Sequence, residues 1–89
     1  MKTLRRDRIT ILGELLLVLN DESKNDRIVL TRVQMKINVS YDRLKKYIGD
    51  LKDLGLIDDE TSLRLTEKGK QYLKEYENVL TFIKHMGLA

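Results

Sequence analysis

Five side chains near the middle of the sequence are spaced so that one helix could present them together: Ser40, Asp42, Arg43, Lys45 and Lys46. Arginine and lysine can donate to the O6 and N7 atoms of guanine, and aspartate can accept from the amino group of cytosine. Hydroxyl and ammonium groups also bind phosphate oxygens. We therefore predict base contacts for Arg43, Lys46 and Asp42 and phosphate contacts for Lys45 and Ser40. Any one of these residues could equally belong to an ordinary solvated helix face. The prediction therefore depends on all five occurring together on one helix.

Positive charge is unevenly distributed along the chain, whose formal net charge is only +3. Basic residues gather at the N-terminus and again around the five candidates. This distribution is typical of a phosphate-binding surface. The further phosphate candidates are Arg5, Arg6, Arg8, Arg32 and Lys36, and Arg64 is a candidate for the minor groove.

The sequence offers no comparable arrangement for catalysis or metal binding. It lacks cysteine, and its one histidine, His85, has no ligand-type neighbours at a useful spacing. No Ser/His/Asp set, carboxylate pair or glycine-rich phosphate loop is visible. The acidic stretch 58–60 lacks the spacing of a calcium-binding loop. We therefore predict a protein that is not an enzyme and that uses no cofactor and no metal.

Composition limits the class of protein and its location. Of the 89 residues, 42% are hydrophobic, which is sufficient for one modest core. No apolar run of about 18 residues could cross a membrane, and no secretory signal follows the basic N-terminus. A cytoplasmic, single-domain protein is the expectation.

Helical periodicity and turn residues locate the first elements. The first helix is predicted over residues 5–19, followed by a polar loop over residues 20–27. The second helix should begin at Leu30 or Thr31, with Thr31 as its N-cap, and end at Ile37.

The third helix carries the five candidates. A turn at residues 38–39 precedes it, Ser40 should cap it and Gly55 should end it. Tyr41 and Tyr47 are expected to pack at the rim of the core with hydrogen-bonded hydroxyls, rather than to stack on bases. The side chains expected to face the core are Leu44, Ile48 and Leu51.

The segment after the third helix predicts a β-hairpin. Residues 56–57 and 63–65 would form its strands, with the polar residues 58–61 at its tip. Thr66 should cap a last helix that reaches about Met86. This order of elements is that of a winged helix-turn-helix. The predicted fold class is therefore mainly α, with a small β-hairpin wing and a long C-terminal helix.

The last helix carries a stripe of apolar residues over about 20 residues, roughly 30 Å of helix. Part of the stripe could simply pack on the first helix, but its far half would then be exposed. We therefore predict a DNA-binding domain over residues 1–66 and a dimerisation helix over residues 67–89, within one structural unit. The residues predicted to form a homodimer are Leu73, Tyr76, Val79, Leu80 and Ile83.

A family resemblance covers the middle of the chain. The motifs that carry it are Thr31-Arg32-Val33, Val39-Ser40-Tyr41, Tyr47-Ile48, Leu51, Leu54, Leu56-Ile57 and Leu65-Thr66-Glu67-Lys68-Gly69-Lys70. Together they resemble archaeal winged-helix DNA-binding proteins, most closely the ten-kilodalton dimeric type with a C-terminal antiparallel coiled coil. The resemblance implies a homodimer on double-stranded DNA. The last helix here is shorter than the coiled coil of that type.

These observations predict a homodimeric protein that binds double-stranded DNA and regulates transcription, in the manner of a repressor. Two alternatives stay open, because fold alone does not settle function. One is a non-specific chromosome-organising protein, and the other is a winged-helix module for protein contacts. The basic third helix favours DNA over a protein partner, and the low net charge favours a specific regulator.

Overall fold

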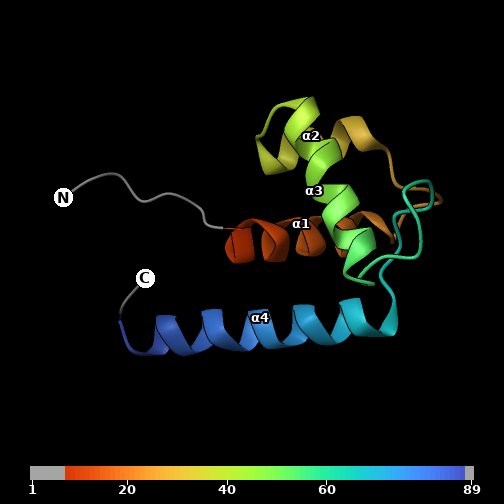
Figure 1. Ribbon diagram of the computed structural model, residues 1–89. Helices are drawn as coiled ribbons and strands as arrows, with labels where there is room; N and C mark the ends of the chain where they lie inside the picture. The colour runs from red at the N-terminus through yellow and green to blue at the C-terminus, as the bar shows by residue number, and fades with distance from the viewer. Residues whose placement is uncertain (1–7, 88–89) are drawn as a thin grey trace.

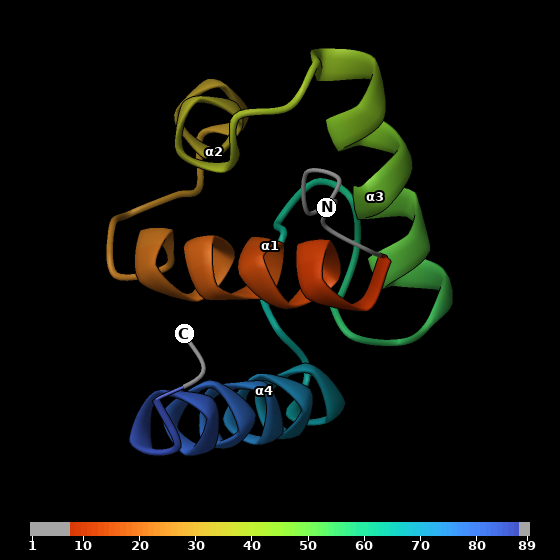
Figure 2. The ribbon, with the colours of Figure 1, turned by 90° about the vertical axis from the view of Figure 1, so that its left-hand side faces the viewer.

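Four helices form most of the computed structural model, which describes residues 8–87. They are α1 (Arg8–Glu22), α2 (Leu30–Ile37), α3 (Tyr41–Asp53) and α4 (Glu67–His85). Two views at right angles show α1 between α4 on one side and the α2–α3 pair on the other (Figures 1 and 2). The predicted mainly α fold with a long last helix is confirmed.

The core surrounds α1, which explains why that helix is apolar on most of its surface. Leu15, Leu16 and Leu19 are fully buried, and the predicted inner face of α3 packs against the same cluster. Leu73 adds a contact from α4 on the opposite side. The α3 helix is therefore held against the body of the domain by the apolar side chains of its inner face.

The first helix extends beyond its predicted end at residue 19 and stops at Glu22. The polar residues near its end looked like a loop in the sequence. The side chain of Glu22 is buried, however, and accepts a hydrogen bond from Lys36 of α2 at 2.6 Å. The longer helix thus brings a carboxylate to a partner that compensates its burial. The predicted start at residue 5 lies outside the described residues.

The N-cap predicted at Thr31 is wrong. The second helix starts at Leu30, and the flanking residue Val29 makes no side-chain cap. The backbone N–H groups of Arg32 and Val33 both donate to the carbonyl of Val29, at 3.1 and 3.2 Å, which places Thr31 inside the first turn.

The other helix boundaries follow the predicted chemistry. Ser40 accepts from the N–H of Arg43, and Thr66 accepts from the N–H of Gly69, so both act as N-caps. Asn38 ends α2 in the left-handed region at φ 60°, and Gly55 follows α3 at φ 76°.

The wing is a loop with a single β-bridge rather than a hairpin with two strands, within the described part of the chain. Ile57 and Leu65 form that antiparallel bridge, and the N–H of Asp58 donates to the carbonyl of Arg64. Leu63 has a positive φ of 60°, which interrupts the extended backbone of the predicted return strand. Leu63 and Leu65 are nonetheless both buried, so the predicted alternation of side chains is kept.

The start of α4 lies very close to the turn after α3. The N–H of Thr66 donates to the carbonyl of Leu56 at 3.1 Å, and a Cβ atom on Gly69 would overlap that same carbonyl oxygen. Only glycine permits this approach of helix to backbone. In α3, by contrast, a Cβ atom on Gly49 would meet nothing within 4 Å.

The two glycines should therefore respond oppositely to alanine. We expect Gly69→Ala to lower the free energy of unfolding by about 2 kcal/mol, because the overlap outweighs the gain in helix propensity. Gly49→Ala, the matched control, should raise it by up to about 1 kcal/mol. Urea denaturation measures both, and equal effects at the two positions would contradict the close approach at Gly69.

Candidate nucleic-acid interface

The N-terminus of α3 is fixed by the turn that precedes it. The left-handed Asn38 reverses the chain direction after α2, and its N–H donates to the carbonyl of Gln34 at 2.9 Å. The side chain of Gln34 in turn donates to the carbonyl of Val39 at 3.3 Å. With the Ser40 cap, these bonds set the angle between α2 and α3.

The C-terminus of α3 is fixed by α4. Lys68 donates from Nζ to the carbonyl of Leu54 at 2.6 Å, and the hydroxyl of Thr66 donates to the carbonyl of Gly55 at 2.6 Å. The N–H of Leu56 closes the last turn on the carbonyl of Leu51. Both ends of α3 are therefore tied to the scaffold, which leaves its outer face free to meet a ligand without rearrangement.

That outer face carries all five candidates of the third helix. Asp42, Arg43, Lys45 and Lys46 are exposed, as is Ser40 at the cap. Gly49 follows on the same ridge with open space beside it, so a nucleic-acid backbone could approach closely there. The structure thus brings these side chains together as the sequence predicted.

Two of the cations on α3 lie against tyrosines. The Arg43 guanidinium donates to the hydroxyl of Tyr47 at 2.9 Å, and the Lys45 ammonium lies 5.9 Å from the centre of the Tyr41 ring. Tyr47 is at the rim of the core with a bonded hydroxyl, as predicted. The same prediction was wrong for Tyr41, which is 49% exposed.

Arg32 and Lys36, predicted to bind phosphate, both lie against an acid of their own chain. Glu22 Oε1 lies 3.2 Å from Arg32 Nε, and Glu22 Oε2 lies 2.6 Å from Lys36 Nζ. Asp21 adds a second ion pair to Lys36. The Glu22 side chain is only 2% exposed, so the two cations neutralise a buried carboxylate at the junction of α1 and α2.

This cluster links stability to pH. The hydrogen bond from Lys36 is the main cause that lowers the pKa of Glu22, and the same bond raises the pKa of Lys36. A depressed carboxyl pKa contributes stability that is present above the unfolded value of about 4.3 and is lost as pH falls through the folded value.

We therefore expect Glu22→Gln to lower the melting temperature at pH 7, and the difference from the wild-type protein to shrink as pH falls below about 4. Thermal melts between pH 3 and 7 measure this. Glu77→Gln is the matched control, since the Glu77 side chain is exposed on α4 and makes no hydrogen bond or ion pair with another described side chain. A difference that stays constant with pH would show that the Glu22 charge is not what matters.

Arg64, the minor-groove candidate, lies against the loop between α1 and α2. Its guanidinium donates to the carbonyls of Ser23 at 3.2 Å and Asp26 at 3.3 Å. At the wing tip, the N–H groups of Ser62 and Thr61 bind the Asp59 carboxylate and lower its pKa. The wing is thus tied to the α1–α2 loop and presents an acidic tip.

The N-terminal arginines are only partly described. Arg8 begins α1, and its Nε lies 3.6 Å from Asp50 Oδ2 on α3. Arg5 and Arg6 lie outside the described residues. The start of α1 therefore lies beside one flank of α3.

Sequence reasoning missed Glu22 and the partners of the α3 cations. Glu22 sat in a segment read as a polar loop, and nothing local distinguishes it from the acids around it. The pairing of Arg43 with Tyr47 did have a signal, since residues four apart on a helix lie next to each other.

The last helix has two different halves. Leu73 is 5% exposed in the core, and the Tyr76 ring lies over Gly13 of α1, where a Cβ atom would come within 2.6 Å of it. Beyond these residues α4 extends past the start of α1 (Figure 1). Val79 and Phe82, in this second half of α4, are exposed.

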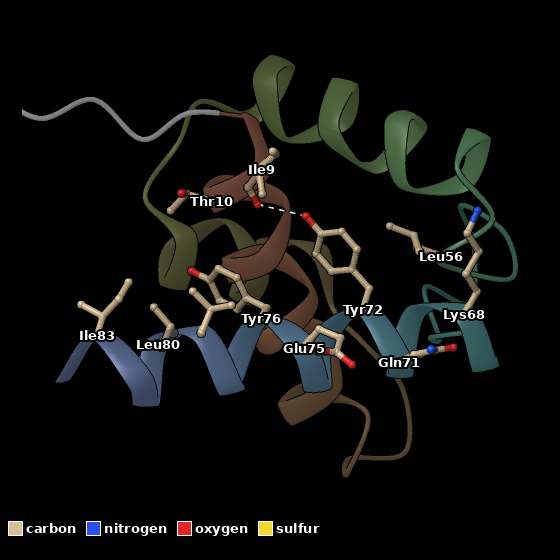
Figure 3. Close-up of a pocket in the computed structure, with 11 residues that line it drawn as sticks. Ile9, Thr10, Leu56, Lys68, Gln71, Tyr72, Glu75, Tyr76, Leu80 and Ile83 are labelled. Atoms are coloured by element: carbon tan, nitrogen blue, oxygen red, sulfur yellow. Dashed lines mark hydrogen bonds between the residues drawn. The ribbon is translucent and has the colours of Figure 1, made fainter. Parts of the chain in front are cut away.

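A mainly apolar groove of about 610 Å³ runs along α4 beside the first turn of α1 (Figure 3). Tyr72 crosses it and donates from its hydroxyl to the carbonyl of Ile9 at 3.2 Å. Leu80 and Ile83 line its far end. Of the residues predicted to form a dimer, Leu73 and Tyr76 are thus used within the chain, and Val79, Leu80 and Ile83 line open surface.

Residues 8–87 hold neither a metal-binding cluster of side chains nor a membrane-spanning helix. They contain no group of three or more histidine, cysteine, aspartate or glutamate side chains arranged to hold a metal ion. Over the same range, no helix is both long and apolar enough to cross a bilayer.

The helices, the tight turn before α3 and the loop after it define a winged helix-turn-helix. The sequence profile of the winged helix-turn-helix family matches residues 5–84. The chain belongs to this family. Comparison with curated proteins and with solved structures gave no match.

Proposed function

We propose that the protein binds double-stranded DNA as a homodimer and acts in the cytoplasm as a transcriptional regulator of repressor type. One observation carries the proposal: α3 is tied to the scaffold at both ends and presents a basic outer face. A helix held outward in this way fits the major groove, with its N-terminal residues at the base edges.

The residues of α3 take different roles in this proposal. Arg43 and Lys46 donate to base edges, and Asp42 accepts from cytosine. Lys45 and Ser40 bind phosphate, helped by the positive end of the helix dipole.

The cations of α2 and of the wing can bind DNA only if they leave their partners within the chain. Arg32, Lys36 and Arg64 would join the interface only if DNA drew them away from the groups that they hold. We therefore place most of the phosphate contacts of the folded chain on α3 itself.

The dimer would form through the outer half of α4. Val79, Leu80 and Ile83 line the apolar groove along α4, and the helix itself extends past the start of α1 (Figure 1). Exposed apolar surfaces of this kind usually mark a partner. The resemblance to archaeal winged-helix proteins with a C-terminal coiled coil supports a second copy as that partner. Leu73 and Tyr76 would support the contact from within each chain.

Fluorescence anisotropy with labelled duplexes tests the proposal. Binding at about 50 mM salt is expected, with a preference for two half-sites about 10 base pairs apart, since two recognition helices would be related by a two-fold axis. Enrichment of one sequence from a randomised duplex pool would indicate a specific regulator, and equal binding to all sequences a chromosome-organising protein. No duplex binding at about 50 mM salt would defeat the DNA proposal and favour a protein-interaction module.

A further inference from the structure

Both tyrosines of α3 lie beside cations, but the two contacts differ. Arg43 Nη2 donates to the Tyr47 hydroxyl at 2.9 Å, and the centre of the guanidinium lies 5.8 Å from the ring centroid. The Lys45 ammonium lies 5.9 Å from the Tyr41 ring, and no hydrogen bond joins the two side chains within the described structure. Arg43 is therefore held by a directional bond, whereas Lys45 is held only by a non-directional attraction.

Tyr47 can hold a guanidinium in place because the tyrosine is itself fixed. Its side chain packs against the hydrophobic core beside the inner face of α3 and is half-buried. A tyrosine side chain has two torsion angles, and packing of the ring restricts both. The hydroxyl oxygen is thus an acceptor at a fixed place on the flank of the helix.

The bond to Tyr47 leaves most of the guanidinium available. Arginine carries five N–H donors in one plane, and this contact uses one of them. A bidentate contact to guanine requires that plane in a defined orientation. A side chain ordered before DNA arrives loses less conformational freedom on binding, so its contacts discriminate between bases more strongly.

We propose that Tyr47 is a positioning residue for base reading, which acts by orienting the Arg43 guanidinium. Tyr47 itself need not touch DNA in this account. The inference rests on the proposed DNA binding, and it adds that sequence discrimination at one base pair depends on a side chain at the rim of the core.

A double-mutant cycle of Arg43→Ala and Tyr47→Phe tests the inference. The probes are the duplex that the wild-type protein enriches from a randomised pool and the same duplex changed at the base pair where Arg43→Ala relaxes selection. Tyr47→Phe should weaken binding to the enriched duplex between about 2- and 10-fold, the range of one net hydrogen bond, and leave binding to the changed duplex unaltered. In the Arg43→Ala background it should have no further effect.

The second tyrosine of α3 provides the control for this experiment. Tyr41→Phe removes a hydroxyl from the same helix but no bond to a cation, and should leave both affinities unaltered. Equal losses on both duplexes from Tyr47→Phe, or an undiminished loss in the Arg43→Ala background, would overturn the positioning role. A wild-type protein that binds duplexes without sequence preference would also overturn it and leave DNA binding intact, whereas absence of duplex binding would refute the proposed function itself.

Discussion

If the proposed dimer forms through α4, replacement of both Leu80 and Ile83 with lysine should convert it into a monomer. The two side chains line the far end of the groove along α4, and Leu80 is 37% exposed in the single chain. In a two-fold interface each substitution acts twice, so four apolar side chains lose their burial. At about 1.5 kcal/mol each, the loss is about 6 kcal/mol, or roughly a 10⁴-fold rise in the dimer dissociation constant.

Light scattering at several concentrations measures the change, with circular dichroism to verify the helices. Asn78→Lys with Thr81→Lys is the matched control, because both residues are exposed on α4 outside the groove and the added charge is the same. The control should remain a dimer. A wild-type chain that is monomeric at about 100 μM would refute the dimer, since a functional dimer should be far tighter.

The sequence predicts well those parts of the fold that are set by residues close to one another along the chain. Ser40 and Thr66 cap helices by bonding to residues three positions ahead, and Gly55 adopts a left-handed conformation that glycine favours. Leu44 and Ile48 face inward because helical spacing places them on one side. Each of these features can be read from a few neighbouring residues.

The features that the sequence did not reveal depend on contacts between distant residues. The end of α1 is set by Glu22, whose partner Lys36 is 14 residues away. The path of the wing is set in part by Arg64, which reaches back across 38 residues to Asp26. A carboxylate and two cations in such arrangements look like any exposed charges until the fold brings them together.

Contacts between distant residues also limit how far the basic residues of α2 can take part in DNA binding. The distribution of positive charge along the sequence made Arg32 and Lys36 candidates for phosphate binding. In the folded chain they lie against Glu22 and Asp21. The candidate interface is therefore narrower than the sequence suggests, and it is concentrated on α3.

If the interface is confined to α3, the affinity for duplex DNA should depend on salt concentration in a defined way. If α2 is excluded, α3 retains three candidate cations in each half-site, Arg43, Lys45 and Lys46. The two half-sites of a dimer then displace about as many counterions as six neutralised phosphates would, at the low end of the usual range. The logarithm of affinity should then fall with the logarithm of salt concentration with a slope of about −5, because each neutralised phosphate contributes about −0.9. Between about 50 and 200 mM salt, duplex binding should weaken roughly 10³-fold.

Two variants divide this slope between α2 and α3. Lys45→Ala should flatten it by about 2, since a dimer loses one phosphate contact in each half-site. Lys36→Ala, the matched control, should leave the slope unaltered because its ammonium is held by Glu22 at 2.6 Å. Anisotropy titrations of the three proteins over the same salt range measure the difference. If Lys36→Ala flattens the slope as much as Lys45→Ala does, DNA must draw Lys36 away from Glu22, and α2 belongs to the interface after all.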